Sequence, residues 1–159
     1  ICSLFHLFNR IAAQNSEYTA FDKADLDTVM ASGIITFGAT PVPFSEETGI
    51  DETDISHAIR DNLKKNILAV IEVSTGSVAA CVAIGDKNTL DNTPQESLEH
   101  GFEQLSRLLG EGSVVHRGIY HTSKPGLVVY TIIGGIDPPK DFVDPQETLP
   151  KDQEDKDAE

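Results

Sequence analysis

One feature constrains the fold of this chain more than any other. Short runs of β-branched residues alternate with longer segments in which apolar residues recur at helical spacing. β-Branched runs bounded by glycine or proline are typical of buried strands, whereas apolar residues three and four positions apart are typical of amphipathic helices. The predicted strands are residues 33–39, 77–85, 113–121 and 126–134. The predicted helices between them are residues 51–70 and 93–109. This β-α-β-α-β-β order predicts an α+β domain, a four-stranded mixed sheet with helices packed on one face.

Local signals refine three of these predictions. Residues 67–73 have the composition of a strand, but the apolar stripe that begins at Ile55 continues to Val70, so we expect one long helix. Thr93, with Pro94 and Glu96 after it, is predicted to form a capping box at the start of the next helix. The last two strands are separated only by a turn-like stretch, 122–126, and are expected to form a hairpin.

The first 14 residues have an apolar arc too wide for a helix that packs on one side only. Six apolar residues cover more than half of the helix circumference: Ile1, Leu4, Phe5, Leu7, Phe8 and Ile11. A helix of this kind needs cover on several sides. We therefore expect a second domain over it, and a longer protein of which this chain, beginning at Ile1, is a piece.

Acidic residues dominate the composition. The 159 residues include 26 Asp and Glu against 12 Lys and Arg, a net charge of -14. Such a charge repels phosphate backbones and anionic membrane surfaces, so we expect no nucleic-acid partner. No apolar stretch reaches the roughly 18 to 20 residues that span a bilayer, so we expect no membrane insertion. Residues 137–159 hold nine of the acidic residues, three lysines and four prolines, which is typical of an acidic disordered tail.

Cysteine, glycine and histidine patterns exclude several kinds of site. Cys2 and Cys81 are too few for a disulfide framework or a cysteine-rich zinc site, and suit reduced thiols in a cytoplasmic protein. The glycines lack the spacing of a phosphate-binding loop, so the chain alone is predicted to bind no nucleotide. His116 and His121 lie on one predicted strand, five residues apart, and are expected to point to opposite faces as satisfied or exposed side chains.

Two carboxylates stand at the start of a short predicted helix that ends near Ala31. Asp22 is placed to cap this helix, Asp25 takes its third position, and Phe21 can pack on Leu26 as a hydrophobic staple. Carboxylates three residues apart lie on one side of a helix, where together they can orient a water molecule. On local evidence, capping and the helix dipole already account for both residues.

The segment Ala20–Met30, AFDKADLDTVM, follows an apolar helix and leads into the first strand. It resembles the catalytic loop and following helix of the FtsZ/tubulin superfamily. The downstream segments resemble, in order, the next helix, the following strand and the closing strands of archaeal FtsZ-like and CetZ-like proteins: residues 51–75, 77–85, 115–120 and 128–136. The resemblance covers residues 1–136.

The resemblance implies three parts: residues 1–14 as the end of a central inter-domain helix, 15–136 as the C-terminal domain and 137–159 as the tail. In this family a separate N-terminal domain holds GTP, and the C-terminal domain's loop reaches the GTP of the next subunit in a filament. The resemblance therefore implies an assembly and GTPase-activating domain of a cytoskeletal GTPase, with GTP and Mg²⁺ as cofactors of the full-length protein. Asp22 and Asp25 would be its catalytic residues, and the fragment alone is expected to be inactive.

One departure from the family pattern leaves alternatives open. The family motif is similar to Asn-x-Asp-x-x-Asp, and Ala20 stands where the amide is usual. A methyl group cannot make the hydrogen bonds of an amide, so a catalytically silent interaction module is one alternative. The other is a small trimeric enzyme of chorismate-mutase-like fold, which would need a cationic site. The arginines are instead scattered along the sequence: Arg10, Arg60, Arg107 and Arg117.

Overall fold

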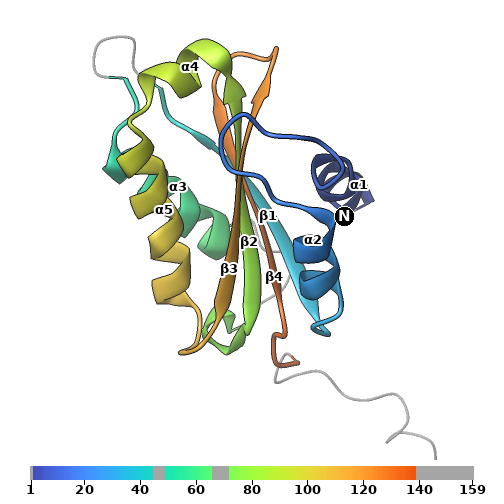
Figure 1. Cartoon of the computed structure of the whole chain (residues 1–159). Helices are drawn as coiled ribbons and strands as arrows, with labels where there is room; N and C mark the ends of the chain where they lie inside the picture. The colour runs from blue at the N-terminus through green and yellow to red at the C-terminus, as the bar shows by residue number, and fades with distance from the viewer. Residues whose placement is uncertain (1, 45–48, 66–71, 139–159) are drawn as a thin grey trace, which may run out of the picture.

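A computed structural model of the chain places one four-stranded sheet between two layers of helices (Figure 1). It describes residues 2–44, 49–65 and 72–138. The strands are β1 (Ile35–Val42), β2 (Val78–Asp86), β3 (Val114–Thr122) and β4 (Leu127–Gly134). The α-helices are α1 (Cys2–Ile11), α2 (Lys23–Met30), α3 (Glu52–Lys65), α4 (Lys87–Asn92) and α5 (Gln95–Leu108), and one turn of 3-10 helix spans Val73–Thr75.

All four predicted strands are present, and the sheet is mixed as predicted. The strand order is β1-β4-β2-β3. β4 runs antiparallel to both of its neighbours, β1 and β2, whereas β2 and β3 are parallel. The strand β3 therefore lies at one edge of the sheet and β1 at the other.

The predicted hairpin is wrong, because β2 lies between β3 and β4. Six consecutive residues of β2, Val78–Ala83, are buried, as is typical of a strand covered on both faces. The turn between β3 and β4 crosses the end of β2, where Gly126 N donates to Asp86 Oδ2 at 2.8 Å and Asp86 N donates to Gly126 O at 3.1 Å. The turn is thus where the sequence places it, but it joins strands that are not partners.

The helices α3 and α5 cover one face of the sheet, as predicted (Figure 1). They bring apolar residues of their predicted stripes into the main core, including Ile55 and Ile59 of α3 and Phe102 of α5. The two helices approach closely at Gly101, where a Cβ atom would lie 2.3 Å from Ile55 Cγ2. The helical prediction is confirmed as far as Lys65, and its last part, residues 66–70, lies outside the described residues.

The other face of the sheet is covered by α1 and α2, so helices lie on both faces (Figure 1). Phe8 and Ile11 of α1 are 0% and 2% exposed, and the Phe8 ring lies 6.0 Å from that of Phe21 and 5.9 Å from that of Phe37. Part of the wide apolar arc is therefore covered within this chain. Phe5 is 44% exposed, and the second domain expected over α1 stays a prediction.

The capping box predicted at Thr93 is not formed. Pro94 is the N-cap of α5 and makes no side-chain cap hydrogen bond. Thr93 is instead the C-cap of α4, a short helix that the sequence did not predict, and its hydroxyl donates back to Thr89 O at 2.7 Å. Residues 139–159 of the predicted tail lie outside the described residues, and within the described ranges no helix is long and apolar enough to cross a membrane.

Candidate functional site

Asp22 and Asp25 form a reciprocal capping box at the start of α2. Asp22 Oδ1 accepts a hydrogen bond from Asp25 N at 2.9 Å, and Asp25 Oδ2 accepts one from Asp22 N at 3.1 Å. Two amide groups that have no partner within the helix are satisfied in this way. The predicted capping roles of both residues are confirmed, and each role uses one oxygen of the carboxylate.

Phe21, the residue before the N-cap, is hydrogen-bonded to a side chain of the sheet. Phe21 is 0% exposed, and the Tyr120 hydroxyl of β3 accepts a hydrogen bond from Phe21 N at 2.8 Å and donates one to Phe21 O at 2.9 Å. Burial raises the pKa of Tyr120, and the charges of Asp25 and Asp22 raise it further, so the hydroxyl keeps its proton at neutral pH. Phe21 and Leu26 are both buried in the core beneath α2, as the predicted staple requires.

Residues 16–22, the acidic loop, lead to the acidic pair Asp22 and Asp25 and lie along the open edge of β3. Ile119 N donates to Thr19 O at 2.8 Å, and the Ser16 hydroxyl donates to Ile119 O. The Tyr18 hydroxyl reaches α4, where it donates to Asp91 Oδ1 at 3.0 Å. Backbone groups of an edge strand that would otherwise face solvent are thereby paired, and the loop is anchored to both β3 and α4.

A histidine that sequence analysis did not assign to the site contacts the acidic pair. His116 Nδ1 lies 2.7 Å from Asp25 Oδ1, and both side chains are partly buried. The imidazole also packs edge-on against the ring of Phe21, with 6.5 Å between centroids. His116 and Tyr120 are four residues apart on β3 and so share a face, which is the one signal in the sequence that could have placed His116 near this loop. His121 is exposed.

The carboxylates have the chemistry to bind water or to help bind a cation. Asp22 is exposed, and within the described ranges its Oδ2 atom makes no hydrogen bond or ion pair. Mg²⁺ in proteins is commonly held by one or two carboxylates together with substrate phosphates and water. The unpaired oxygen of Asp22 fits such an arrangement if the phosphates come from another domain or subunit. The catalytic role of Asp22 and Asp25 stays a prediction.

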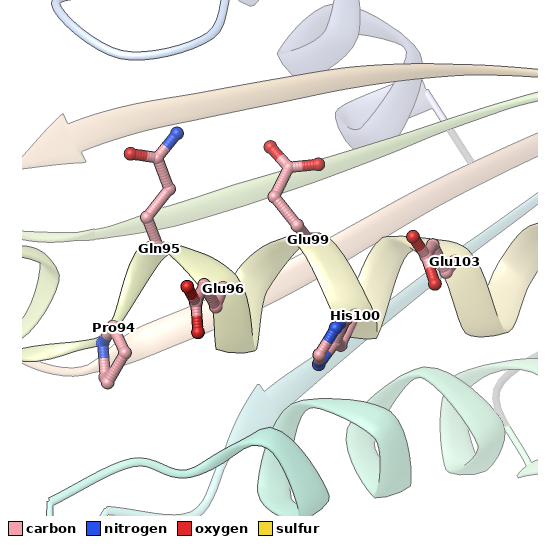
Figure 2. Close-up of a pocket in the computed structure, with 6 residues that line it drawn as sticks. All are labelled: Pro94, Gln95, Glu96, Glu99, His100 and Glu103. Atoms are coloured by element: carbon pink, nitrogen blue, oxygen red, sulfur yellow. The ribbon is translucent and has the colours of Figure 1, made fainter.

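Two hollows flank α5. One is wide open, has a volume of about 540 Å³, and is lined by Pro94, Gln95, Glu96, Glu99, His100 and Glu103. In Figure 2, Gln95 and Glu99 point to the same side of the helix, and Glu99 accepts a hydrogen bond from Arg117 of β3 at 2.5 Å. Three glutamates make this hollow unfavourable for an anion such as a phosphate.

The second hollow has a volume of about 550 Å³ and lies between the acidic loop and the junction of α4 and α5. Its apolar residues are Leu90, Leu98 and Ile119, and its polar residues include Tyr18 and Asp91. Those two polar side chains are joined by a hydrogen bond. Neither hollow contains Asp22 or Asp25.

Comparison with solved structures identifies the fold. A GTPγS-form protofilament of TubZ from Bacillus thuringiensis serovar israelensis matches 87% of this chain with a TM-score of 0.72 and 16% identity. CetZ from Methanosaeta thermophila matches 81% with a TM-score of 0.58 and 22% identity, and FtsZ from M. jannaschii matches 79% with a TM-score of 0.63 and 16% identity. The described domain therefore has the fold of the C-terminal domain of tubulin and FtsZ.

These matches cover only a part of the longer chains. The chain matches 33% of TubZ, 34% of CetZ and 35% of FtsZ, and so spans about a third of their length. No family model and no curated protein matches the sequence. The comparisons thus give the fold, and what the site does has to be argued from its own residues.

Proposed function

We propose that this chain is the assembly and GTPase-activating domain of a tubulin/FtsZ-like cytoskeletal GTPase. In this proposal, Asp22 and Asp25 complete the GTP site of the adjoining subunit in a filament. The observation that carries it is the exposed acidic cap of α2, which stands on a loop anchored to β3 in a domain of this fold. Two of the matched TubZ structures are a protofilament and a four-stranded filament, which supports self-association.

The acidic pair would act by placing water. An exposed carboxylate oxygen accepts a hydrogen bond from a water molecule and aligns it with the γ-phosphate of the neighbouring subunit's GTP. Mg²⁺ bound to the phosphates would neutralise their charge. No covalent intermediate on the protein is needed, since phosphoryl transfer depends mainly on positioning and electrostatic stabilisation.

The division of labour follows from what this chain does not carry. Its glycines do not have the spacing of a phosphate-binding loop. Each of the two hollows beside α5 includes acidic residues, three glutamates in one and Glu17 and Asp91 in the other. The GTP would therefore be held by an N-terminal domain of a longer protein. The isolated chain is expected neither to bind nor to hydrolyse GTP.

The test replaces both carboxylates with amides in the full-length protein. Asn keeps the size and much of the capping geometry but removes the charge, so D22N/D25N should fold and assemble while phosphate release per polymerised subunit falls by about tenfold or more. The matched control is D27N, because Asp27 is exposed on the same helix and takes no part in the capping box. D27N should release phosphate at the normal rate.

Capping alone would give a different pattern. If the pair only caps α2, D22A/D25A loses about 0.5 to 2 kcal/mol of stability for each cap, whereas the Asn pair releases phosphate normally from normal polymers. That result would refute the catalytic role. Polymers of the unaltered protein that release no phosphate would instead identify the silent interaction module that Ala20 suggests.

The alternative of a small trimeric enzyme has less support. Such an enzyme needs clustered cations for an anionic substrate. Three of the four arginines instead each form a hydrogen bond with a different residue. Arg117 donates to Glu99, Arg107 to Glu103 and Arg60 to Gln104.

A further inference from the structure

The contact between Asp25 and His116 goes beyond what the capping box requires. The box uses Asp25 Oδ2, which accepts from Asp22 N at 3.1 Å. The remaining oxygen, Oδ1, lies 2.7 Å from His116 Nδ1. Both oxygens of Asp25 are therefore engaged, one by the start of α2 and one by β3. A carboxylate held at two points in this way has little freedom to rotate.

We propose that His116 is a positioning residue for the acidic pair, which it holds in the orientation needed for turnover through its contact with Asp25. The proposal rests on the proposed function, because it assigns His116 a part in the same reaction. In this proposal His116 carries a proton on Nδ1, which faces Asp25 Oδ1 at 2.7 Å. Asp25 in turn orients Asp22 through the two hydrogen bonds of the capping box.

The histidine is itself held in place. Its ring packs against the edge of Phe21, and within the part of the chain that the structure describes its Nε2 atom is buried without a hydrogen-bond partner. Nδ1 is thus the nitrogen through which the ring makes its polar contact. Tyr120 holds the backbone of Phe21 from the same face of β3. One strand therefore supports the loop at two points, the backbone before the cap and the carboxylate within it.

The other hydrogen bonds of the acidic loop do not hold the carboxylates themselves. The hydrogen bonds of Thr19, Ser16 and Tyr18 anchor the loop before Ala20. Among the described residues, His116 is the one outside the capping box that forms an ion pair or hydrogen bond with a carboxylate of the pair. A displacement of a reacting group by about 1 Å can slow an enzyme by about 100-fold, so a support of this kind matters for rate.

The experiment compares three replacements of His116 in the full-length protein. Asn places an amide donor near the position of Nδ1, Gln places one near Nε2, and Leu has no donor. We expect H116L and H116Q to lower phosphate release per polymerised subunit by about 10- to 100-fold with little change in the KM for GTP. H116N should recover most of the rate. The matched control is H121L, which removes an exposed histidine from the same strand and should leave the rate unchanged.

A merely structural role would not distinguish Asn from Gln. Equal rates for H116N and H116Q, or a normal rate for H116L, would therefore overturn the proposal, and thermal melting of each variant establishes that it is folded. In the combination D25N/H116L, the second change should add nothing to the loss from the first, because His116 acts through Asp25. Additive losses would overturn the proposal. If D25N alone turns over normally, the proposed function itself fails, and this inference fails with it.

Discussion

The Tyr120 hydroxyl offers the clearest test of how the acidic loop is held. It accepts a hydrogen bond from Phe21 N at 2.8 Å and donates one to Phe21 O at 2.9 Å. Tyr120 is 5% exposed and Phe21 is 0% exposed. The substitution Y120F removes only the oxygen and leaves both backbone groups of Phe21 in an apolar site without this partner.

The cost follows from these two contacts. A typical hydrogen bond contributes about 0.5 to 1.5 kcal/mol, and a buried polar group left unpaired costs about 1 to 3 kcal/mol. Two backbone groups lose their partner here, so we expect Y120F to lower the free energy of unfolding by about 2 to 4 kcal/mol. A domain typically has only about 5 to 15 kcal/mol in total, so the variant should fold with a clearly reduced margin.

Urea unfolding and amide hydrogen exchange measure the effect. The amide of Phe21 should lose most of its protection in Y120F, and the unfolding midpoint should fall without a change in the slope of free energy against urea. The matched control is Y130F. Tyr130 packs against the same apolar cluster, and within the described ranges its hydroxyl makes no hydrogen bond. If Y120F lies within about 0.5 kcal/mol of the unaltered protein and Phe21 stays protected, the clamp is not what holds the loop.

Two further predictions concern the scaffold. A Cβ atom at Gly38 would lie 1.6 Å from Asn62 Oδ1, so G38A should displace this buried amide and lower the free energy of unfolding by about 2 to 4 kcal/mol; an unchanged urea midpoint would contradict this. Hydrogen bonds from the Thr89 hydroxyl and the amides of Thr89 and Gly126 lower the pKa of Asp86. Its contribution to stability is then full above the ordinary aspartate pKa of about 4 and is lost as the pH falls through the lowered value. Thermal melts should show a smaller loss in acid for D86N than for the unaltered protein, and parallel curves would refute the assignment.

The strands and long helices were predictable because each is set by the residues within it. Apolar residues in α3 and α5 recur every three or four positions because one side of each helix is buried, so the stripe is visible in the sequence. The start of α2 was also predictable, since Asp22 and Asp25 are local partners in the chain.

The strand order was not predictable in the same way. The β-branched composition of β3 and β4 indicates buried strands, but it does not specify which neighbour each strand takes. The small, buried residues of β2 favour the centre of the sheet, and a central β2 separates β3 from β4. The short helix α4 was missed because its six residues carry no apolar stripe of useful length.

His116 was missed for a related reason. A period of two residues tells which face of β3 it shares with Tyr120, but not which loop covers that face. Ser16 of the loop that does so lies 103 residues before Ile119 in the chain, and the loop is held there by the hydrogen bonds of Thr19 and Ser16 to Ile119. A site assembled across such a separation becomes visible only once the sheet edge and its covering loop are placed together.

Capping and chemistry do not compete for the same atoms of the acidic pair. Asp22 uses Oδ1 for the cap, and its Oδ2 makes no hydrogen bond or ion pair within the described ranges, so an Asn at this position can keep the cap and change only the other atom. Asp25 differs, because Asp22 N faces one of its oxygens and His116 Nδ1 faces the other. An Asn at this position replaces one of those oxygens with an amide nitrogen, so one of the two contacts is lost. D22N is therefore the cleaner probe of charge at the exposed oxygen. D25N also disturbs the link to β3, so a larger loss in D25N than in D22N is what the contact with His116 requires.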